Sequence, residues 1–424
     1  MFSTCCQLPF QNREKPAFPG ISAFWPLFHA AHSLYGHYND ILLFQYYRLK
    51  EAEKMRFSCQ VTDLNNGLSI ATHALSPRST LPILEGVFLE AMGERLTLTC
   101  SDGAMTISTC IDAEIEEEGK LVMPGRLFCD VVRKLPQGTL NFSSNENRIA
   151  TLRCCGSRTT IAARAGDLFP MPQEIAAPKT VLMPQPTLRN MILQTSFAVS
   201  VDEMRKILTG CLLEINAGEA RMVATDGFRL AVRIARLENV QDSLRAVIPG
   251  KLLQEMSKIV DGTEDDDPVE LCFGDKQLLL RVNRTQVYAT LLEGEYINYR
   301  SIIPASFKTT VKVLDREQLM LCIERASLMA RESKTNLVKL SISPDMMVIT
   351  SNSEMGDVYE EIQTQTDGEP LEIAFNVKYL SDVIKVVDDD EFLLRFNSGI
   401  SPCVVSPIEE GGYTYMVLPC RLNA

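Results

Sequence analysis

Val122-Met-Pro-Gly-Arg-Leu-Phe-Cys-Asp-Val-Val-Arg-Lys-Leu-Pro136 is the first of three related stretches in this chain. The second begins Val247-Ile-Pro-Gly-Lys-Leu-Leu, and the third begins Ala374-Phe-Asn-Val-Lys-Tyr-Leu. Their equivalent residues are 125 apart from 123 to 248 and 127 apart from 248 to 375. Because that spacing is one domain length, the sequence predicts three copies of one domain.

Each copy predicts a short helix. A proline at the first helical position, or an asparagine cap in the third copy, precedes apolar residues at helical spacing. The opposite face carries a basic, acidic, basic pattern at i, i+4 and i+7: Arg126, Asp130, Arg133; Lys251, Glu255, Lys258; Lys378, Asp382, Lys385. One such face is typical of a solvated helix with intrahelical ion pairs. Three copies with one sign pattern favour a shared anionic ligand.

Composition places the chain among ordinary globular proteins. It has 424 residues, 46% hydrophobic and 23% charged, and we find no apolar run long enough to span a membrane. Its 13 cysteines lack Cys-x-x-Cys spacing, which favours a reducing cytosol over disulfides or a zinc site. The net charge of −12 does not exclude a nucleic-acid ligand, because the local field steers a polyanion.

Residues 1–54 do not share the repeat. They contain the single tryptophan and three of the four histidines, without a periodicity or a ligand spacing typical of a metal site. A signal peptide is poorly supported there. We expect an extension outside the fold, as a start assigned too far upstream would give, with Met55-Arg-Phe opening the first strand.

The repeat continues beyond its charged helix. An early helix is predicted in each copy, over 63–74, 187–195 and 315–329, followed by hairpins that turn at residues 101–103, 225–227 and 351–353. Strand pairs follow at 140–153, 269–282 and 392–405. The predicted class is α+β, with each domain a sheet plus two helices. Proline-rich linkers place the domains at 55–180, 181–307 and 308–424.

Signals of catalysis are weak. The sequence has no Walker-type phosphate loop, no His-Glu-x-x-His and no Gly-x-Ser-x-Gly. His73 is the one histidine inside the repeats. A metal-dependent enzyme that uses Asp102 and Asp226 is the alternative function, but both aspartates lie at turns, where aspartate commonly bonds to the local backbone. We therefore predict a non-catalytic protein with no metal or other cofactor.

Three motifs carry a resemblance to a known family. Thr225-Asp-Gly-Phe-Arg-Leu-Ala231, Asn298-Tyr-Arg-Ser-Ile-Ile-Pro304 and Met416-Val-Leu-Pro-Cys-Arg-Leu422, on a threefold repeat that begins at Met55, resemble the bacterial DNA polymerase III beta subunit, or beta sliding clamp. The resemblance covers residues 55–424. It implies the DNA clamp fold, in a head-to-tail dimeric ring whose hole is lined by helices and encircles duplex DNA.

The resemblance also implies partners and a location. The expected partners are duplex DNA without sequence preference, the DNA polymerase III catalytic subunit, a clamp loader, other polymerases and repair proteins that carry short linear peptides, and a second copy of this chain. No membrane partner is expected, and the expected location is the cytoplasm. The expected function is processivity in DNA replication. A DNA-binding adaptor that never closes a ring is a weaker alternative.

Helix geometry independently favours a dimer. With neighbouring helices about 10 Å apart, six helices would enclose a hole of about 9 Å, too narrow for duplex DNA. Twelve helices from two chains would leave a hole of about 28 Å, which admits the duplex with water around it. Contacts made mainly to phosphates would hold DNA without fixing a register.

The candidate functional residues fall into three sets, of which the pocket and the ring interface are carried over from the family. The residues expected to contact DNA are Arg126, Arg133, Lys134, Arg189, Lys251, Lys258, Lys378 and Lys385. The residues expected to form the partner-peptide pocket are Leu208, Thr225, Gly227, Phe228, Arg229, Leu230, Ile297, Ser301, Ile302, Ile400, Pro402, Met416, Leu418, Pro419, Cys420 and Arg421. Phe228, Ile297, Ser301 and Cys420 depart from common family residues, which leaves the preferred peptide open. Leu328 and Met329 are expected at the ring interface.

Deleting residues 1–54 should leave folding and dimerisation intact, because the repeats begin at Met55. Differential scanning calorimetry and sedimentation of the shortened and full-length chains would check this. A fall of several degrees in melting temperature, about 1 kcal/mol or more of stability, would show that this segment belongs to the fold.

Overall fold

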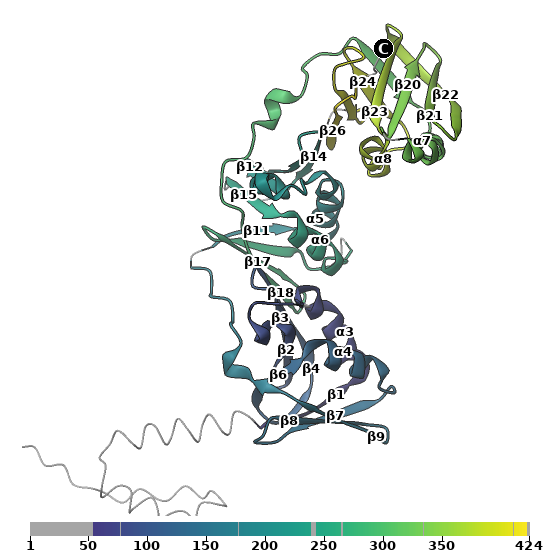
Figure 1. Cartoon of the computed structure of the whole chain (residues 1–424). Coiled ribbons are helices and arrows are strands. Elements are labelled where there is room, and N and C mark those ends of the chain that lie inside the picture. The colour runs from purple at the N-terminus through teal and green to yellow at the C-terminus, as the bar shows by residue number, and fades with distance from the viewer. Residues whose placement is uncertain are drawn as a thin grey trace, which may run out of the picture.

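The computed structural model describes residues 54–421 apart from 77, 177, 239–242, 264–265, 334 and 410. The predicted extension, 1–54, therefore lies outside the described residues except for Lys54. The described chain forms three domains in a row, each with antiparallel strands and two helices (Figure 1). The expected α+β class and the threefold repeat are confirmed.

The three domains repeat one order of elements. Domain 1 contains β1 (Arg56–Gln60), α3 (Val61–Ala71), β2 (Gly86–Met92), β3 (Arg95–Ser101), β4 (Met105–Asp112), β5 (Glu114–Glu117), β6 (Gly119–Pro124), α4 (Gly125–Lys134), β7 (Thr139–Ser144), β8 (Ile149–Cys154), β9 (Ser157–Ala162) and β10 (Arg164–Ala165). Domain 2 contains β11 (Lys179–Met183), α5 (Gln185–Leu193), β12 (Gly210–Asn216), β13 (Glu219–Thr225), β14 (Arg229–Arg236), β15 (Leu244–Pro249), α6 (Gly250–Ile259), β16 (Val269–Phe273), β17 (Gln277–Val282) and β18 (Thr285–Thr290). Domain 3 contains β19 (Thr309–Val313), α7 (Arg316–Glu332), β20 (Leu337–Ile342), β21 (Met346–Ser353), β22 (Gly356–Gly368), β23 (Leu371–Asn376), α8 (Val377–Lys385), β24 (Phe392–Phe396), β25 (Cys403–Ser406) and β26 (Tyr413–Val417).

Short 3-10 helices join several of these elements. Their bounds are Thr72–Ala74, Pro82–Glu85, Gly166–Leu168, Ser196–Ala198, Glu203–Thr209 and Tyr299–Ile302. The turns at Thr72–Ala74 and Ser196–Ala198 follow α3 and α5, the first helices of domains 1 and 2. In domain 3 the single longer helix α7 covers the equivalent positions, so Leu328 and Met329 occupy its last turns.

The charged helices α4, α6 and α8 lie where the sequence predicts them. In α6 and at its C-cap the apolar residues at helical spacing are all buried, at 0–8% exposed: Leu252, Leu253, Met256, Ile259 and Val260. One detail of the helix starts is corrected: Pro124 and Pro249 end the preceding strands, and α4 and α6 begin on the next residue, a glycine. A Cβ on Gly125 would lie 2.7 Å from the carbonyl oxygen of Glu85, which explains this glycine.

The sheets do not stop at the domain boundaries. One sheet of five strands belongs to domain 1 alone, whereas a nine-stranded sheet joins domains 1 and 2 and a twelve-stranded sheet joins domains 2 and 3. Strand β4 pairs with β18 at the first junction, and β14 pairs with β26 at the second. The helix pairs of all three domains lie along one side of the row, on its inner curve (Figure 1). Helices and sheets thus form two continuous layers.

Candidate DNA-facing helices and partner pocket

The residues predicted to contact DNA lie on the helix layer. Arg126, Arg133 and Lys134 are on α4, Arg189 on α5, Lys251 and Lys258 on α6, and Lys378 and Lys385 on α8, and all eight are exposed. All eight cations are thus exposed on helices of the same layer. No described helix is long and apolar enough to cross a membrane.

The acidic residues of the charge pattern form ion pairs, two within their own helix and one between domains. Asp130 pairs with Arg133 at 3.6 Å, and Glu255 pairs with Lys258 at 2.9 Å, as a solvated helix would have. The third copy differs, because Asp382 of α8 accepts from Arg229 of domain 2 at 2.5 Å rather than from a lysine of its own helix. The acidic position of α8 therefore fastens two domains together.

Ion pairs also link domains 1 and 2. The Lys251 ammonium of α6 lies 3.0 Å from the carboxylate of Asp102, and Nδ1 of His73 lies 2.7 Å from Glu255. Lys251 therefore serves the junction while its side chain stays 76% exposed. A cation in this position can still add to the field that a phosphate backbone would meet.

The two candidate catalytic aspartates hold turns. Asp102 accepts from the amides of Ala104 and Met105, and Asp226 accepts from those of Phe228 and Arg229, at 2.8–3.0 Å. Burial alone would raise the pKa of Asp102, but these amides and the ammonium of Lys251 hold it below its ordinary value. The two aspartates lie in separate domains, and no group of three potential metal ligands occurs in the described part of the chain. Their predicted role in the turns is confirmed.

The predicted pocket residues divide into a buried floor and an exposed rim. Leu208, Leu230 and Met416 are at most 6% exposed and belong to an apolar cluster separate from the main core, against which Leu418 packs. The rim carries exposed apolar side chains: Phe228 at 53%, Ile297 at 38%, Ile302 at 43% and Ile400 at 80%. Residues of domains 2 and 3 thus share the buried cluster, and we predict that these exposed side chains surround it.

Other predicted pocket residues mainly shape this surface. Thr225 is buried, and its hydroxyl donates to the carbonyl oxygen of Arg229 at 2.7 Å, while Gly227 has a φ of +92° that favours glycine. Pro402, Pro419 and Cys420 are half-buried, whereas Ser301 and Arg421 are exposed. The amide of Leu418 donates to the carbonyl oxygen of Phe228 at 2.9 Å, which continues the ladder between β14 and β26.

Arg229 lies at the centre of the junction. It is 7% exposed, and its guanidinium donates to Asp226, to Asp382 and to the carbonyl oxygen of Phe197. It also stacks over the rings of Phe197 and Tyr379, at 5.2 and 4.8 Å. The sequence predicts that Arg229 lines the pocket. Its contacts show that it links domains 2 and 3 through Asp226 and Asp382.

Tyr379 was missed in the sequence. Its ring stacks on that of Phe228, with centroids 5.8 Å apart, so it extends the exposed rim from α8. The sequence does contain a difference that points to Tyr379, because the third copy has this tyrosine where the first two copies have Leu127 and Leu252. Alone, an aromatic residue near a helix start is more often part of a core.

Comparison with known proteins identifies the family. Models of the N-terminal, central and C-terminal domains of the DNA polymerase III beta subunit match residues 55–172, 182–298 and 300–421. The chain belongs to the DNA polymerase III beta subunit family. The beta sliding clamp of Staphylococcus aureus strain Mu50 is 34% identical over 371 residues, 85% of this chain and 97% of the relative. That of Staphylococcus epidermidis is 33% identical over 377 residues, 87% and 99%.

Solved structures agree with this assignment. The DNA polymerase sliding clamp of Bacillus subtilis has a TM-score of 0.84 at 32% identity, covering 87% of this chain and 100% of that one. A Pseudomonas aeruginosa sliding clamp bound to griselimycin has a TM-score of 0.81 at 27% identity, with the same coverage. As a sliding clamp, the chain is a non-catalytic processivity factor of DNA polymerase III. These comparisons give no support to the metal-dependent alternative.

Replacing Arg229 with methionine should destabilise the junction of domains 2 and 3. Arg229→Met leaves Asp226 and Asp382 without their shared cation, and breaking such a buried pair costs about 3 kcal/mol. Urea unfolding followed by circular dichroism would measure the loss. The control is Arg236→Met, at the exposed end of the same strand. Equal shifts in the two variants would contradict the role given to Arg229.

Proposed function

We propose that two copies of this chain close head to tail into a ring around duplex DNA and tether the polymerase through the apolar surface between domains 2 and 3. The observation that carries the proposal is a pair of strand edges, on β9 and on the first part of β22, that lack a neighbouring strand among the described residues and lie at the two ends of the row of domains. Both internal junctions join an edge strand of one domain to an edge strand of the next. A third junction of this kind would close the ring.

The free edges match those already paired inside the chain. β9 holds the place in domain 1 that β18 and β26 hold in the next two domains, and it is the last strand of its sheet. β22 holds the place of β4 and β14; it pairs with β21 along residues 356–363, and β19 pairs with it only from residue 364 onward. We infer that β22 of one chain pairs with β9 of its partner, because exposed edges invite such pairing.

Leu328 and Met329 fit this junction. Their repeat positions in domains 1 and 2 include His73, which pairs with Glu255 of domain 2, and Phe197, which packs edge-on to Tyr415 of domain 3 at 6.1 Å. Leu328, at the corresponding position of domain 3, is 60% exposed. The partner's domain 1 would cover it, as the resemblance implies.

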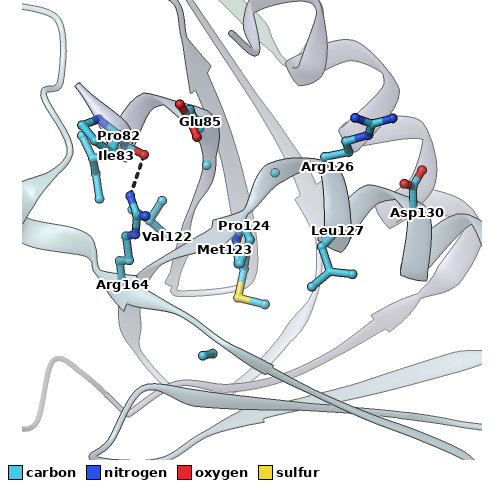
Figure 2. A pocket seen from close by; sticks show the side chains of 13 residues that line it. Pro82, Ile83, Glu85, Val122, Met123, Pro124, Arg126, Leu127, Asp130 and Arg164 are labelled. Carbon is cyan, nitrogen blue, oxygen red and sulfur yellow. Dashed lines mark hydrogen bonds between the residues drawn. The ribbon is translucent and has the colours of Figure 1, made fainter. Parts of the chain in front are cut away.

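A cavity of about 440 Å³ lies beside the start of α4 in domain 1, where we propose that domain 3 of the partner subunit binds (Figure 2). Leu127, at its edge, is 52% exposed, whereas the equivalent Leu252 is 4% exposed at the formed junction. The tip of the β21–β22 hairpin carries Met355, which is 79% exposed and corresponds to the region of Phe228. Since Phe228 stacks on the α8 residue equivalent to Leu127, we infer that Met355 of the partner subunit covers Leu127.

Charged side chains line both ends of the proposed junction. The cavity of domain 1 is lined by Arg126 and Arg164 together with Glu85 and Asp130, and Figure 2 shows Arg164 donating to the carbonyl oxygen of Pro82, at 2.6 Å. The domain 3 hairpin presents Glu354 and Asp357 on its exposed tip. We infer that the two arginines face this acidic tip in the ring.

The DNA-contacting and partner-binding roles follow the surfaces already described. We infer that the eight exposed cations of the helix layer contact phosphates, and that the apolar rim and floor bind short linear peptides of the polymerase and other partners. We further propose, as membership of the family implies, that a separate clamp loader opens the ring and that the protein acts in the cytoplasm. We propose a boundary between domains 1 and 2 just before β11 (Lys179–Met183) instead of the expected 180/181, because Lys179 and Thr180 pair with β16 of domain 2, and we keep 307/308 for the second boundary.

Ring closure predicts topological binding to DNA. Protein placed on a nicked circular plasmid by a clamp loader should remain bound in high salt and leave once the plasmid is linearised, because phosphate contacts weaken with salt whereas encirclement does not. Gel filtration of the labelled protein with the plasmid measures retention. Leu328→Glu is the matched control, expected to be monomeric and unretained. Equal retention on circular and linear DNA would contradict the ring.

Leu418→Ala should weaken binding of a peptide from the polymerase catalytic subunit by about tenfold to a hundredfold, or roughly 1 to 3 kcal/mol, because truncation removes an apolar contact from the pocket. Titration calorimetry would measure it. Lys134→Ala with Lys385→Ala should instead reduce salt-dependent DNA attraction and spare the peptide, since neither lysine has an ion pair in the described chain. Parent-like peptide affinity in a folded, dimeric Leu418→Ala would show that the pocket is misplaced.

A further inference from the structure

Two adjacent cysteines lie at the turn between β8 and β9, on the free end of domain 1. Cys154 ends β8 and is 2% exposed, whereas Cys155 is the one exposed cysteine of the described chain. Their Sγ atoms lie 3.8 Å apart. Cys155 and Gly156 both have positive φ, 44° and 82°, as a two-residue hairpin turn requires. Asparagine or aspartate normally occupies the first position, so turn geometry does not explain a cysteine there.

Both thiols contact the loop behind a DNA-facing helix. Cys154 Sγ donates to the carbonyl oxygen of Pro136 at 3.3 Å, and Cys155 Sγ donates to that of Gln137 at 3.4 Å. This loop joins α4 to β7. At Gly138 a Cβ would lie 2.9 Å from Cys155 Sγ, so the loop leaves room for the sulfur only because a glycine is there.

The surroundings of the exposed thiol are basic. Arg153 and Arg158 are directly opposite each other on β8 and β9, flank the turn and are exposed. Neither has a carboxylate partner within the described residues. Cations beside a thiol attract anionic reagents to it. The exposed sulfur is thus placed to react with an anion, and a second sulfur lies next to it.

We propose that Cys154 and Cys155 are a vicinal dithiol that exchanges with small anionic disulfides of the glutathione type and closes into an intramolecular disulfide. The Cys155 thiolate attacks one sulfur of the reagent, forms a mixed disulfide and releases the first small thiolate. The Cys154 thiolate then attacks the Cys155 sulfur and releases the second. The two cysteines lose two electrons and two protons, and the small disulfide takes both as it becomes two thiols.

The two thiols are suited to different steps. Burial raises the pKa of the Cys154 thiol, and the neighbouring Cys155 raises it further by a smaller amount. A thiol of this kind rarely attacks a reagent in solution, but it can resolve a mixed disulfide that forms beside it. Closing the gap of 3.8 Å requires at least one sulfur to leave the 136–137 loop, which changes the turn that opens β9.

This change would reach the ring interface, a consequence that rests on the proposed ring. The equivalent turn of domain 2 lies at a formed junction, where Thr285 bonds to Thr109 at 3.0 Å and Arg284 pairs with Asp112 at 2.8 Å. Asn283, at the position of Cys155, stays exposed there. By the same geometry, Cys155 stays accessible in a closed ring, and oxidation weakens that ring.

The test treats reduced full-length protein with oxidised glutathione and maps thiols by peptide mass spectrometry. The 154–155 peptide should lose the mass of two hydrogens and retain no glutathione. Cys154→Ser should keep glutathione on Cys155, and Cys155→Ser should not react at this turn. A stable glutathione adduct on Cys155 of the parent, or faster reaction elsewhere in the chain, would overturn the proposal.

Sedimentation equilibrium then compares the reduced and oxidised forms. Oxidation should weaken dimerisation by about tenfold, reversibly with dithiothreitol, whereas the double variant Cys154→Ser, Cys155→Ser should not respond. An oxidised dimer as tight as the reduced one would overturn the proposed control of the ring. A reduced protein that never dimerises would contradict the ring itself, while the mass experiment would still decide the dithiol chemistry.

Discussion

The backbone of an edge strand must find hydrogen-bond partners, and the rest of this structure depends on how that need is met. An unpaired edge exposes a row of amides and carbonyls that can pair with another strand. Here β4 pairs with β18 and β14 with β26, so three domains share continuous sheets. Because the helices pack on these continuous sheets, they all lie on one side of the row of domains. The two edges that lack a neighbouring strand in the described chain, on β9 and β22, are where we propose that a second chain pairs.

Charged residues on the helices both link the domains and leave cations exposed. Asp382 and Lys251 lie on helices that also carry exposed cations, yet each forms an ion pair with a hairpin turn of the preceding domain. One helix face therefore serves two purposes: some of its charges form ion pairs across the domain junctions, and we propose that the others contact phosphates. An overall acidic chain with cations gathered on its inner layer would hold a duplex there and repel it elsewhere.

Much of the fold could be predicted from sequence because the repeat gives the same signal three times. The charged helices, the turns with Asp102 and Asp226, and the buried stripe of α6 all follow from local pattern. What could not be predicted depends on contacts between domains. The partner of Asp382 is Arg229, 153 residues away, and nothing in a helical charge pattern distinguishes that pairing from an intrahelical one. Tyr379 was missed for the same reason, since its significance comes from the ring of Phe228.

A three-dimensional reconstruction of the reduced protein by electron cryo-microscopy tests the central claim most directly. The account predicts a closed ring of six domains from two chains, with helices inside and β22 of each chain beside β9 of its partner. A ring joined through two domain 1 ends, or an open filament built from the same chains, would contradict it.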